Sequence, residues 1–517
     1  MKQKTWIISA LMCAMVIMVC LGVLHLLKEM TENNAPSGTV AEESTDHTEP
    51  EIDFAEEEET KEDIAETGPE EEESDVPVER EEGYYGWKQE LLQIFPSVPE
   101  EVPYEPPRLI LATDLHYQSA QADDGGAAFQ LFVERGDGKV VEYLPELLEA
   151  FMDQVIEEHP SALVLSGDIT MNGEKINHEE LARGLMRVQD AGIPVLIVPG
   201  NHDINNPHAA VYFGEEKAET DPVTPEEFYN IYHMYGYDQA ISRDDASLSY
   251  VYQLDERNRL LMLDTCQYEP KNMVEGQLKV ETLRWADEQL KKAKEDGMNV
   301  LPIGHHNLLA QSRMYTTQCA MNNNGDVIEL FQKYELPLYL SGHLHVQRIR
   351  KHKAEPGAAD DSYGIMEIVT DALSIPPCQY ALLEWKRDGS MEYSTKAVDV
   401  SAWAARTGSQ NPDLLDFEGW SELYIQKLII DQIRGVVKNL GNDVEHSMAE
   451  VYASVYIDYY AGRRIDAKGI RSSKGYRWWE RNMPDSYLLK ELDAMIDDSD
   501  RDNNYMLLPE VNAAAEE

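Results

Sequence analysis

The feature that most constrains this chain is a series of short apolar segments that have the length of buried β-strands. They cover residues 109–111, 162–165, 194–198, 260–263, 300–303 and 338–340. Helical patterns lie between several of them, at residues 145–158, 178–190 and 280–296. Strands that alternate with helices predict an α/β fold whose sheet is covered on both faces. Residues 248–263, with a turn at 255–258, predict a hairpin and therefore a mixed sheet.

Five of these segments are followed at once by side chains that can bind a metal ion. The motifs are Thr113-Asp114-Leu115-His116, Ser166-Gly167-Asp168, Gly200-Asn201-His202-Asp203, Gly304-His305-His306 and Ser341-Gly342-His343-Leu344-His345. A single histidine is usually structural, but open α/β sheets place their sites at the carboxyl ends of strands, where these five motifs would meet. Carboxylate, imidazole and amide ligands without thiolate suit Mn, Fe or Zn. There are enough ligands for two ions, which a shared Asp could hold about 3.5–4 Å apart.

The net charge restricts the partners of the chain. It carries 44 Lys and Arg against 96 Asp and Glu, a formal charge of -52. This acidity argues against a nucleic-acid polymer or an anionic membrane surface as a partner, because both repel negative charge. A small phosphorylated substrate is still compatible, provided that bound metal ions reverse the charge locally.

The N-terminal part predicts a membrane anchor followed by a spacer. Residues 5–27 contain no formal charge and follow Lys2 and Lys4, which predicts a signal anchor within residues 1–30. The alternative is a cleaved signal peptide. Residues 31–82 are rich in Glu, Thr, Pro and Ser and predict a disordered acidic linker. We therefore expect a single-pass membrane protein with its catalytic domain outside the cytoplasm, or a secreted protein if the segment is cleaved.

The C-terminal part predicts a separate helical domain. After Ser401 the strand pattern stops, and apolar residues recur at helical spacing in 425–440, 448–460 and 486–496. Its tyrosines and the Trp478-Trp479 pair are expected to pack in the core and between domains. The predicted domains are thus residues 83–400, which carry the five motifs, and the helical residues 401–517.

The five motifs, in this order, resemble the calcineurin-like metallophosphoesterases, whose pattern is D-x-H, G-D, G-N-H-D/E, a lone H and G-H-x-H. The resemblance covers roughly residues 106–400 and implies a double β-sandwich flanked by helices. Two departures affect the surroundings of the motifs: Met171-Asn172 follow Thr170 where Asp is frequent, and Asn307-Leu308 follow the histidine pair where Pro is common. Neither departure removes an expected metal ligand.

The resemblance implies roles for individual residues. One metal ion would be held by Asp114, His116, Asp168 and His345, and the other by Asp168, Asn201, His305 and His343. Of the adjacent histidines, the pattern favours His305 as the ligand and His306 as a neighbour of the substrate. His202 would stabilise the transition state or protonate the leaving oxygen, and Asp203 would orient it.

The overall layout resembles secreted relatives of the class III cyclic-nucleotide phosphodiesterases. It implies a metal-dependent phosphoesterase that hydrolyses a phosphodiester, such as a cyclic nucleotide, through a hydroxide held on two metal ions. Alternatives are a phosphomonoesterase or pyrophosphatase acting on nucleotides or envelope intermediates, and a non-catalytic surface protein that binds metal. Residues 117–142 form a long connection after the first motif and are a candidate lid. Residues 264–266 and 374–377 are expected to border the cleft.

Overall fold

The computed structural model describes residues 104–352 and 364–508. Its first sheet has the strand order β15-β14-β13-β1-β2-β3. The strands β1, β2 and β3 run parallel, and β13, β14 and β15 extend the sheet in antiparallel pairs. The bounds are β1 (Arg108–Ala112), β2 (Ala162–Ser166), β3 (Val195–Val198), β13 (Gln379–Trp385), β14 (Met391–Ala397) and β15 (Tyr505–Leu508).

The second sheet is mixed and has the order β11-β12-β10-β9-β8-β7-β6. Its bounds are β6 (Ser242–Arg243), β7 (Tyr250–Gln253), β8 (Asn258–Leu263), β9 (Asn299–Gly304), β10 (Leu338–Ser341), β11 (Arg348–Lys351) and β12 (Met366–Val369). The antiparallel pairing of β7 with β8 confirms the predicted hairpin. A small separate sheet pairs β4 (Ala210–Phe213) with β5 (Glu216–Glu219).

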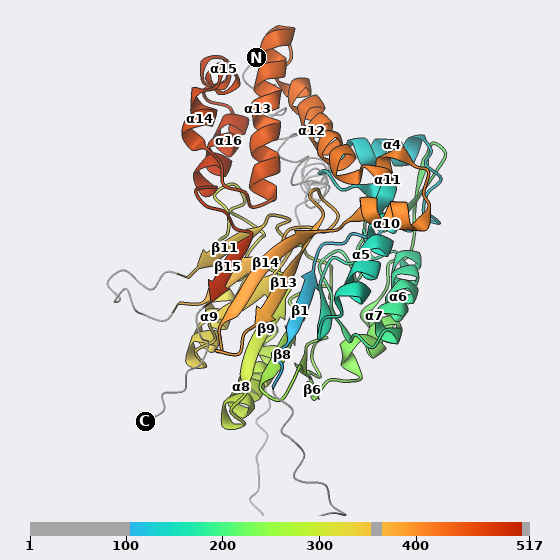
Figure 1. Cartoon of the computed structure of the whole chain (residues 1–517), viewed down its shortest axis with the longest axis vertical. Coiled ribbons are helices and arrows are strands. Elements are labelled where there is room, and N and C mark those ends of the chain that lie inside the picture. The colour runs from blue at the N-terminus through green and yellow to red at the C-terminus, as the bar shows by residue number, and fades with distance from the viewer. Residues whose placement is uncertain (1–103, 353–363, 509–517) are drawn as a thin grey trace, which may run out of the picture. The chain divides into compact units, whose positions relative to one another are not determined.

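The two sheets share one apolar core, and strand periodicity explains how the second sheet is covered on both faces. On β8, Leu260 and Met262 belong to the core shared with β1, β2 and β3, whereas Leu261 and Leu263 pack with α8 and α9 on the opposite face. This arrangement confirms the expected α/β fold (Figure 1). The helices and helical turns of this region are α4 (Ala127–Glu134), η1 (Val141–Tyr143), α5 (Leu144–Glu158), α6 (Lys175–Asp190), α7 (Pro225–Tyr232), η2 (His233–Tyr237), α8 (Val280–Glu295) and α9 (Asn324–Lys333).

A C-terminal helical region follows β14, as predicted. It comprises α10 (Val400–Thr407), α11 (Pro412–Leu415), α12 (Phe417–Val436), α13 (Asn442–Tyr460), α14 (Ala467–Ser472), α15 (Lys474–Asn482) and α16 (Tyr487–Asp498). Trp479 is fully buried in this region and its indole N–H donates to the Met448 carbonyl, so it is a core residue as expected.

The expectation that strand structure ends at Ser401 is wrong. After α16 the chain returns to the first sheet as β15, where Tyr505 pairs with Ser394 and Leu508 with Met391. A segment of four residues pairs with a strand more than a hundred residues away, so its local pattern carries little signal. The helical region is therefore tied to the catalytic sheet at both of its ends.

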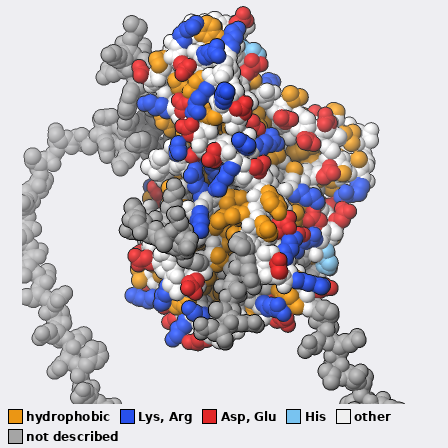
Figure 2. Space-filling view, turned by 60° about the vertical axis from the view of Figure 1, so that its left-hand side comes forward, with side chains coloured by type: hydrophobic (Ala, Val, Ile, Leu, Met, Phe, Trp, Pro, Cys, Tyr) orange, Lys and Arg blue, Asp and Glu red, His pale blue; other side chains and the backbone are white. Residues whose placement is uncertain are grey.

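The predicted anchor at residues 5–27 and the predicted linker at residues 31–82 lie outside the described residues. Among the residues that the structure does describe, no helix combines the length and hydrophobicity that a membrane span requires. On the face seen in Figure 2, Lys and Arg side chains are interspersed with Asp and Glu.

Candidate metal centre and active site

Strained backbone at the ends of the strands is the first sign of a site. Asp114, His116, Asp168, His343 and His345 have φ of 53°, 45°, 47°, 69° and 58°. Left-handed backbone at residues other than glycine costs about 1–3 kcal/mol each and persists where surrounding structure enforces it. Five of the seven expected ligands thus share a conformation that turns their side chains inward just after a strand.

Two glycines allow these turns to pack closely. A Cβ atom on Gly200 would collide with the backbone N and the carboxylate of Asp168. Gly167 has φ 93°, and a Cβ atom there would lie 2.5 Å from the ring of His305. Both positions therefore require glycine, because the Gly200 backbone packs directly against Asp168 and the Gly167 backbone packs directly against the His305 ring.

The first expected ligand group is brought together in the structure. One ligand atom each from Asp114, His116, Asp168 and His345 lies within 4.8 Å of the others, and all four residues are buried. The Nε2 atoms of His116 and His345 are 3.0 Å apart. Asp114 Oδ1 lies 3.2 Å from His345 Nε2.

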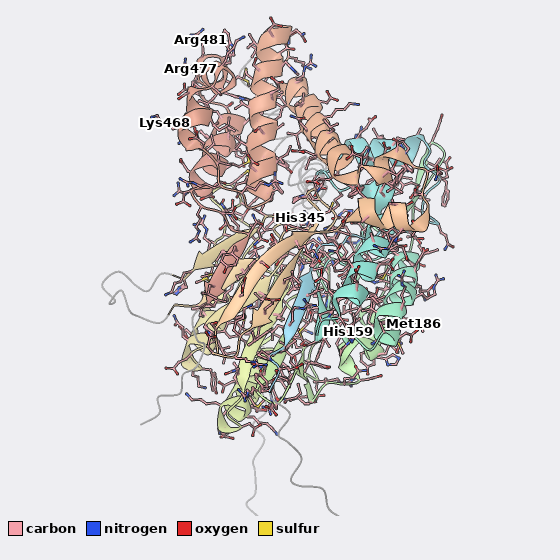
Figure 3. The ribbon with its side chains drawn as sticks, in the orientation of Figure 1. His159, Met186, His345, Lys468, Arg477 and Arg481 are labelled. Carbon is pink, nitrogen blue, oxygen red and sulfur yellow. The ribbon has the colours of Figure 1, made fainter. Side chains whose placement is uncertain are left out.

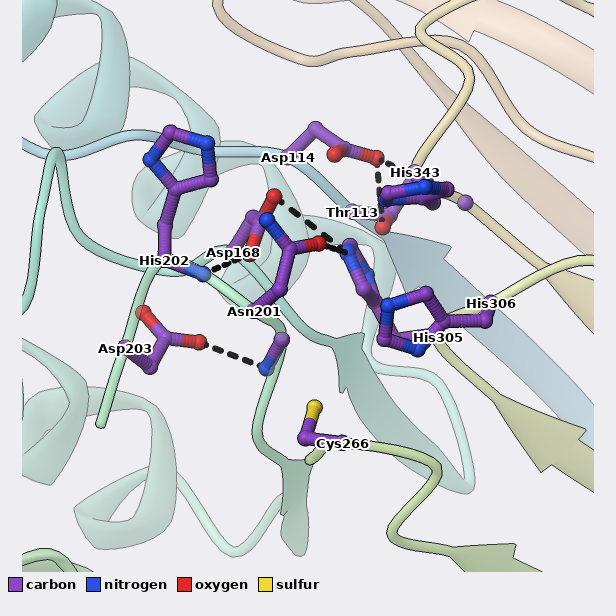
Figure 4. A network of polar contacts seen from close by, with 12 residues as sticks. Thr113, Asp114, Asp168, Asn201, His202, Asp203, Cys266, His305, His306 and His343 are labelled. Carbon is purple, nitrogen blue, oxygen red and sulfur yellow. Dashed lines mark hydrogen bonds and ion pairs between the residues drawn. The ribbon is translucent and has the colours of Figure 1, made fainter. Parts of the chain in front are cut away.

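The second group meets the first at Asp168. His305 Nε2 lies 3.2 Å from Asp168 Oδ2 and 3.2 Å from Asn201 Oδ1. The same Asp168 oxygen lies 4.0 Å from His116 Nε2, on the side of the first group. Asp168 therefore stands between the two groups, which is the position expected of a bridging carboxylate (Figure 4).

The geometry distinguishes between the adjacent histidines. Both ring nitrogens of His306 are engaged, Nδ1 with Thr265 Oγ1 at 2.8 Å and Nε2 with the Val274 carbonyl at 2.9 Å. His305 uses only Nδ1 in this way, on the Ser166 carbonyl, and presents Nε2 to Asp168 and Asn201. The His306 ring is fully buried between those two partners and also lies in a group with His305 and His343 whose ligand atoms are within 4.8 Å of one another, so its place beside the substrate stays a prediction.

His343 completes the second group through its ring. Its Nε2 lies 2.9 Å from the Gln318 carbonyl, which leaves Nδ1 as the ligand atom. Its ring centroid is 5.1 Å from that of His305, and its backbone N–H donates to Asp114 Oδ2. All seven expected ligands are thus gathered at the ends of the strands, six of them buried and His343 half-buried.

The surroundings of His202 differ from the expectation. The ring contacts the Met171 carbonyl through Nδ1 at 2.7 Å and the Asn172 side chain at 3.1 Å, so the two residues that depart from the family pattern hold it. The Asp203 carboxylate instead accepts hydrogen bonds from the backbone N–H groups of Gly200 and Thr170. Figure 4 shows the His202 ring pointing away from that carboxylate, so Asp203 does not contact the ring directly and its orienting role stays a prediction.

Burial and mutual charge set the protonation of the site. Burial raises the pKa of Asp168, but His305 and His202 outweigh it and hold that pKa well below its usual range. Burial lowers the pKa of His305, but Asp168 and Asp114 raise it to about 9. Burial lowers the pKa of His202 although Asp168 opposes the shift. Asp168 is therefore ionised at neutral pH, whereas burial and the charge of Asp168 raise the pKa of Asp203 to about 7.

The donor set fits divalent metal ions. Asp114 Oδ1 is buried and has no hydrogen-bond partner among the described residues. This oxygen faces the Nε2 atoms of His116 and His345, which also face each other. The carboxylate and the two rings therefore present more electron pairs than there are protons between them. Oxygen and imidazole ligands of this kind suit Mn, Fe or Zn. The residues present therefore fit the expected cofactor.

The segments expected to border the site do so. Besides Thr265, which contacts His306, the Ser374 hydroxyl donates to the Asp114 carbonyl at 2.8 Å. A cavity of about 140 Å³ opens beside the ligands and is lined by His343 and His345 together with Tyr315, Tyr460 and Tyr487. The last two tyrosines belong to the C-terminal helical region, which thus contributes to the wall of the site.

Three buried charged residues beside the site are not among the residues predicted from the sequence. Asp137 and Lys139 lie in the long connection 117–142, which contains the helix α4 and ends in a buried turn rather than an open loop. Glu367 on β12 accepts hydrogen bonds from the backbone of Leu308 and Leu309, just beyond the histidine pair. For Asp137 and Lys139, the only signal in the sequence was that residues 117–142 form a long loop with charged residues. Glu367 gave no signal, because it lies within an apolar strand.

Comparison with known proteins matches two regions of the chain. Residues 107–347 match the family model described as calcineurin-like phosphoesterase. The chain contains a calcineurin-like phosphoesterase domain. Phosphoesterases of this kind are hydrolases, and the phosphoesterase domain carries all seven expected ligands. Residues 399–502 match the model described as the C-terminal domain of cyclic nucleotide phosphodiesterase. A comparison with the curated proteins finds no match.

Solved structures similar to this chain include two phosphatases. A dimetal phosphatase from Danio rerio is 16% identical over 57% of this chain and 97% of its own, with a TM-score of 0.43. A purple acid phosphatase from yellow lupin (Lupinus luteus) seeds is 13% identical over 57% of this chain and 52% of its own, with a TM-score of 0.38.

Proposed function

We propose that this chain hydrolyses phosphodiesters, with a cyclic nucleotide as substrate, at a site that binds two divalent metal ions. The match of residues 399–502 to the C-terminal domain of cyclic nucleotide phosphodiesterase carries the choice of a diester. The cavity lined by His343, His345 and Tyr487 supports it, because the helical region borders the space beside the ligands.

The ligand assignment follows the two groups. Asp114, His116, Asp168 and His345 would hold one ion, and Asp168, Asn201, His305 and His343 the other. When bound, such ions polarise phosphoryl oxygens and lower the pKa of water. They also supply the positive potential that a chain of charge -52 needs in order to bind a phosphate.

His202 is the proposed acid–base residue. With Nδ1–H donated to the Met171 carbonyl, Nε2 is the atom free to exchange a proton with the substrate. The ring lies beside that of His116, with 4.8 Å between the centroids, and so at the edge of the first ligand group. A bound phosphate would add negative charge beside the imidazole and favour its protonation, and the ring could then give that proton to the leaving oxygen.

The test is hydrolysis by the purified full chain supplied with Mn²⁺. We expect turnover of bis(p-nitrophenyl) phosphate and of cyclic nucleotides, with loss of activity in Asp168→Asn and unchanged activity in Glu134→Gln, an exposed control. Activity on p-nitrophenyl phosphate or nucleoside diphosphates but not on diesters would contradict the substrate class. No hydrolysis by a chain that binds two ions would contradict the enzymatic role and favour a non-catalytic metal-binding protein.

We also propose that residues 5–27 anchor the chain in a membrane, with the phosphoesterase domain outside the cytoplasm. The uncharged segment and its preceding lysines support this proposal. Fractionation of cells that express the full chain, followed by protease treatment from outside, tests it. We expect the chain in the membrane fraction and accessible to protease; a cytosolic, protected chain would contradict it.

A further inference from the structure

A buried carboxylate outside the expected ligand set contacts the site. Asp137 Oδ2 lies 3.4 Å from His345 Nδ1, on the side of the ring opposite to the Nε2 that faces Asp114 and His116. A carboxylate on one imidazole nitrogen fixes the tautomer, because it takes the N–H and leaves the lone pair on the other nitrogen. His345 is thus held in the form that a metal ligand requires.

The Asp137 charge is compensated by Lys139. The Lys139 Nζ atom lies 2.6 Å from Asp137 Oδ2, and both side chains are about 5% exposed or less. A buried carboxylate without such a partner would be costly, so the pair keeps an ionised acceptor next to His345.

The helical region holds this turn of the chain in place. Three backbone carbonyls accept hydrogen bonds from it: Gly136 from Gln432, Asp137 from Tyr456 and Lys139 from Tyr424. Between them Gly138 has φ 108°, and a Cβ atom there would lie 2.9 Å from Ile425 Cδ1. The turn therefore fits against α12 and α13 with no room for a side chain. Figure 3 shows His345 where the helical region meets the sheets.

We propose that Asp137 is a positioning residue for His345, and that the C-terminal helices act on the metal site by holding Asp137 in place. This inference rests on the proposed function, because it assumes that His345 binds a metal ion. It gives the helical region a role that does not depend on contact with the substrate. It also explains why the connection 117–142 is packed inward rather than left open.

The test is titration of the metal-free full chain with Mn²⁺, followed by calorimetry, in wild type and variants. Loss of an outer carboxylate partner usually weakens metal binding about 10–100-fold. We expect Asp137→Ala to weaken binding of one of the two ions by that factor and to leave the other unchanged. Asp137→Asn keeps an oxygen acceptor for the His345 N–H and should recover part of the affinity. Tyr456→Phe should cause a smaller loss of the same kind, and Glu134→Gln none.

The outcomes separate this inference from the proposed function. If the wild-type chain binds no Mn²⁺, the proposed function fails. If the wild type binds two ions and hydrolyses diesters, but Asp137→Ala and Asp137→Asn bind both ions with wild-type affinity, only the role of Asp137 is overturned. Circular dichroism identifies variants that fail to fold. In that case Asp137→Asn, which preserves size, decides the question through its metal affinity.

Discussion

The Nε2 atoms of His116 and His345 face each other at 3.0 Å inside a buried pocket that also contains Asp114 Oδ1, 3.2 Å from His345 Nε2. At most one proton can lie between the two rings, so the pocket is rich in electron pairs and poor in protons. A bound cation would accept these electron pairs and relieve the repulsion between them. The stability of the fold should therefore depend on bound metal.

Metal removal gives the first prediction. We expect the chain treated with a chelator to unfold at a lower temperature than the chain with Mn²⁺, and the difference to grow with metal concentration. Ligand present at a hundred times its dissociation constant stabilises a protein by about 2.7 kcal/mol. Differential scanning calorimetry across a metal series measures this. Identical unfolding temperatures with and without metal would contradict the account.

The second prediction separates chemistry from metal binding. His202→Ala should lower kcat by about 10²–10⁴-fold, the usual contribution of an acid–base residue, while metal content stays at the wild-type level. Asn201→Ala, one residue away, should instead lower metal content. Kinetics and metal analysis on the same preparations distinguish the two. A His202→Ala variant with unchanged kcat would exclude the proposed role.

The third prediction concerns the close packing around Asp168. Gly200→Ala places a methyl group against the Asp168 carboxylate and should displace it, which lowers metal affinity and activity together. Gly192→Ala is the matched control for a glycine near a strand of the same sheet: its φ is 85°, which strains alanine, but the site is open and distant from the ligands. It should cost stability only. Equal metal binding by both variants would refute the packing argument.

The fourth prediction is a pH dependence of stability in the helical region. Glu491 is buried beside the Tyr452 hydroxyl, and burial raises the pKa of its carboxyl to about 7. Its pKa is higher in the folded than in the unfolded chain. The stabilisation is therefore complete below the unfolded value of 4.5 and is lost as the pH rises to 7. The slope is about 1.4 kcal/mol per pH unit.

Urea unfolding at several pH values compares the wild type with Glu491→Gln. The variant keeps an acceptor for Tyr452 and should lack this slope, so its stability relative to the wild type should increase from pH 5 to pH 7. Parallel pH profiles for the two proteins would show that Glu491 is ionised in the folded chain.

The strands and their terminal motifs could be predicted because both are local signals. The apolar runs before Asp114, Asp168 and Asn201 identify these strands by themselves. Parallel strands bring their carboxyl ends to the same edge of the sheet, however the helices between them are packed. The packing of the two sheets against each other could not be predicted in this way. The burial pattern of β8 shows that both faces of the strand are covered, but it does not show which element covers each face. The packing of one sheet on the other was expected only from the resemblance to the calcineurin-like metallophosphoesterases.

Other parts of the site depend on contacts between distant segments. Asp137 contacts His345 because α12 and α13 hold its turn in place. The sequence near Asp137 gives no indication that the turn packs against those helices. The contacts of Asp203 also could not be predicted from its place in the sequence. A neighbour in sequence to His202 was expected to be its partner, whereas the turn directs the two side chains apart and Met171 supplies the contact.

We propose that seven residues, six of them buried and His343 half-buried, bind two metal ions that share Asp168. The most direct measurement is equilibrium dialysis of the full chain against Mn²⁺, with metal analysis of wild type and Asp168→Asn. We expect two ions per wild-type chain and weakened binding of both in Asp168→Asn, since the substitution affects both groups. A wild-type chain that binds no ion, or an Asp168→Asn variant that binds two ions with unchanged affinity, would contradict it.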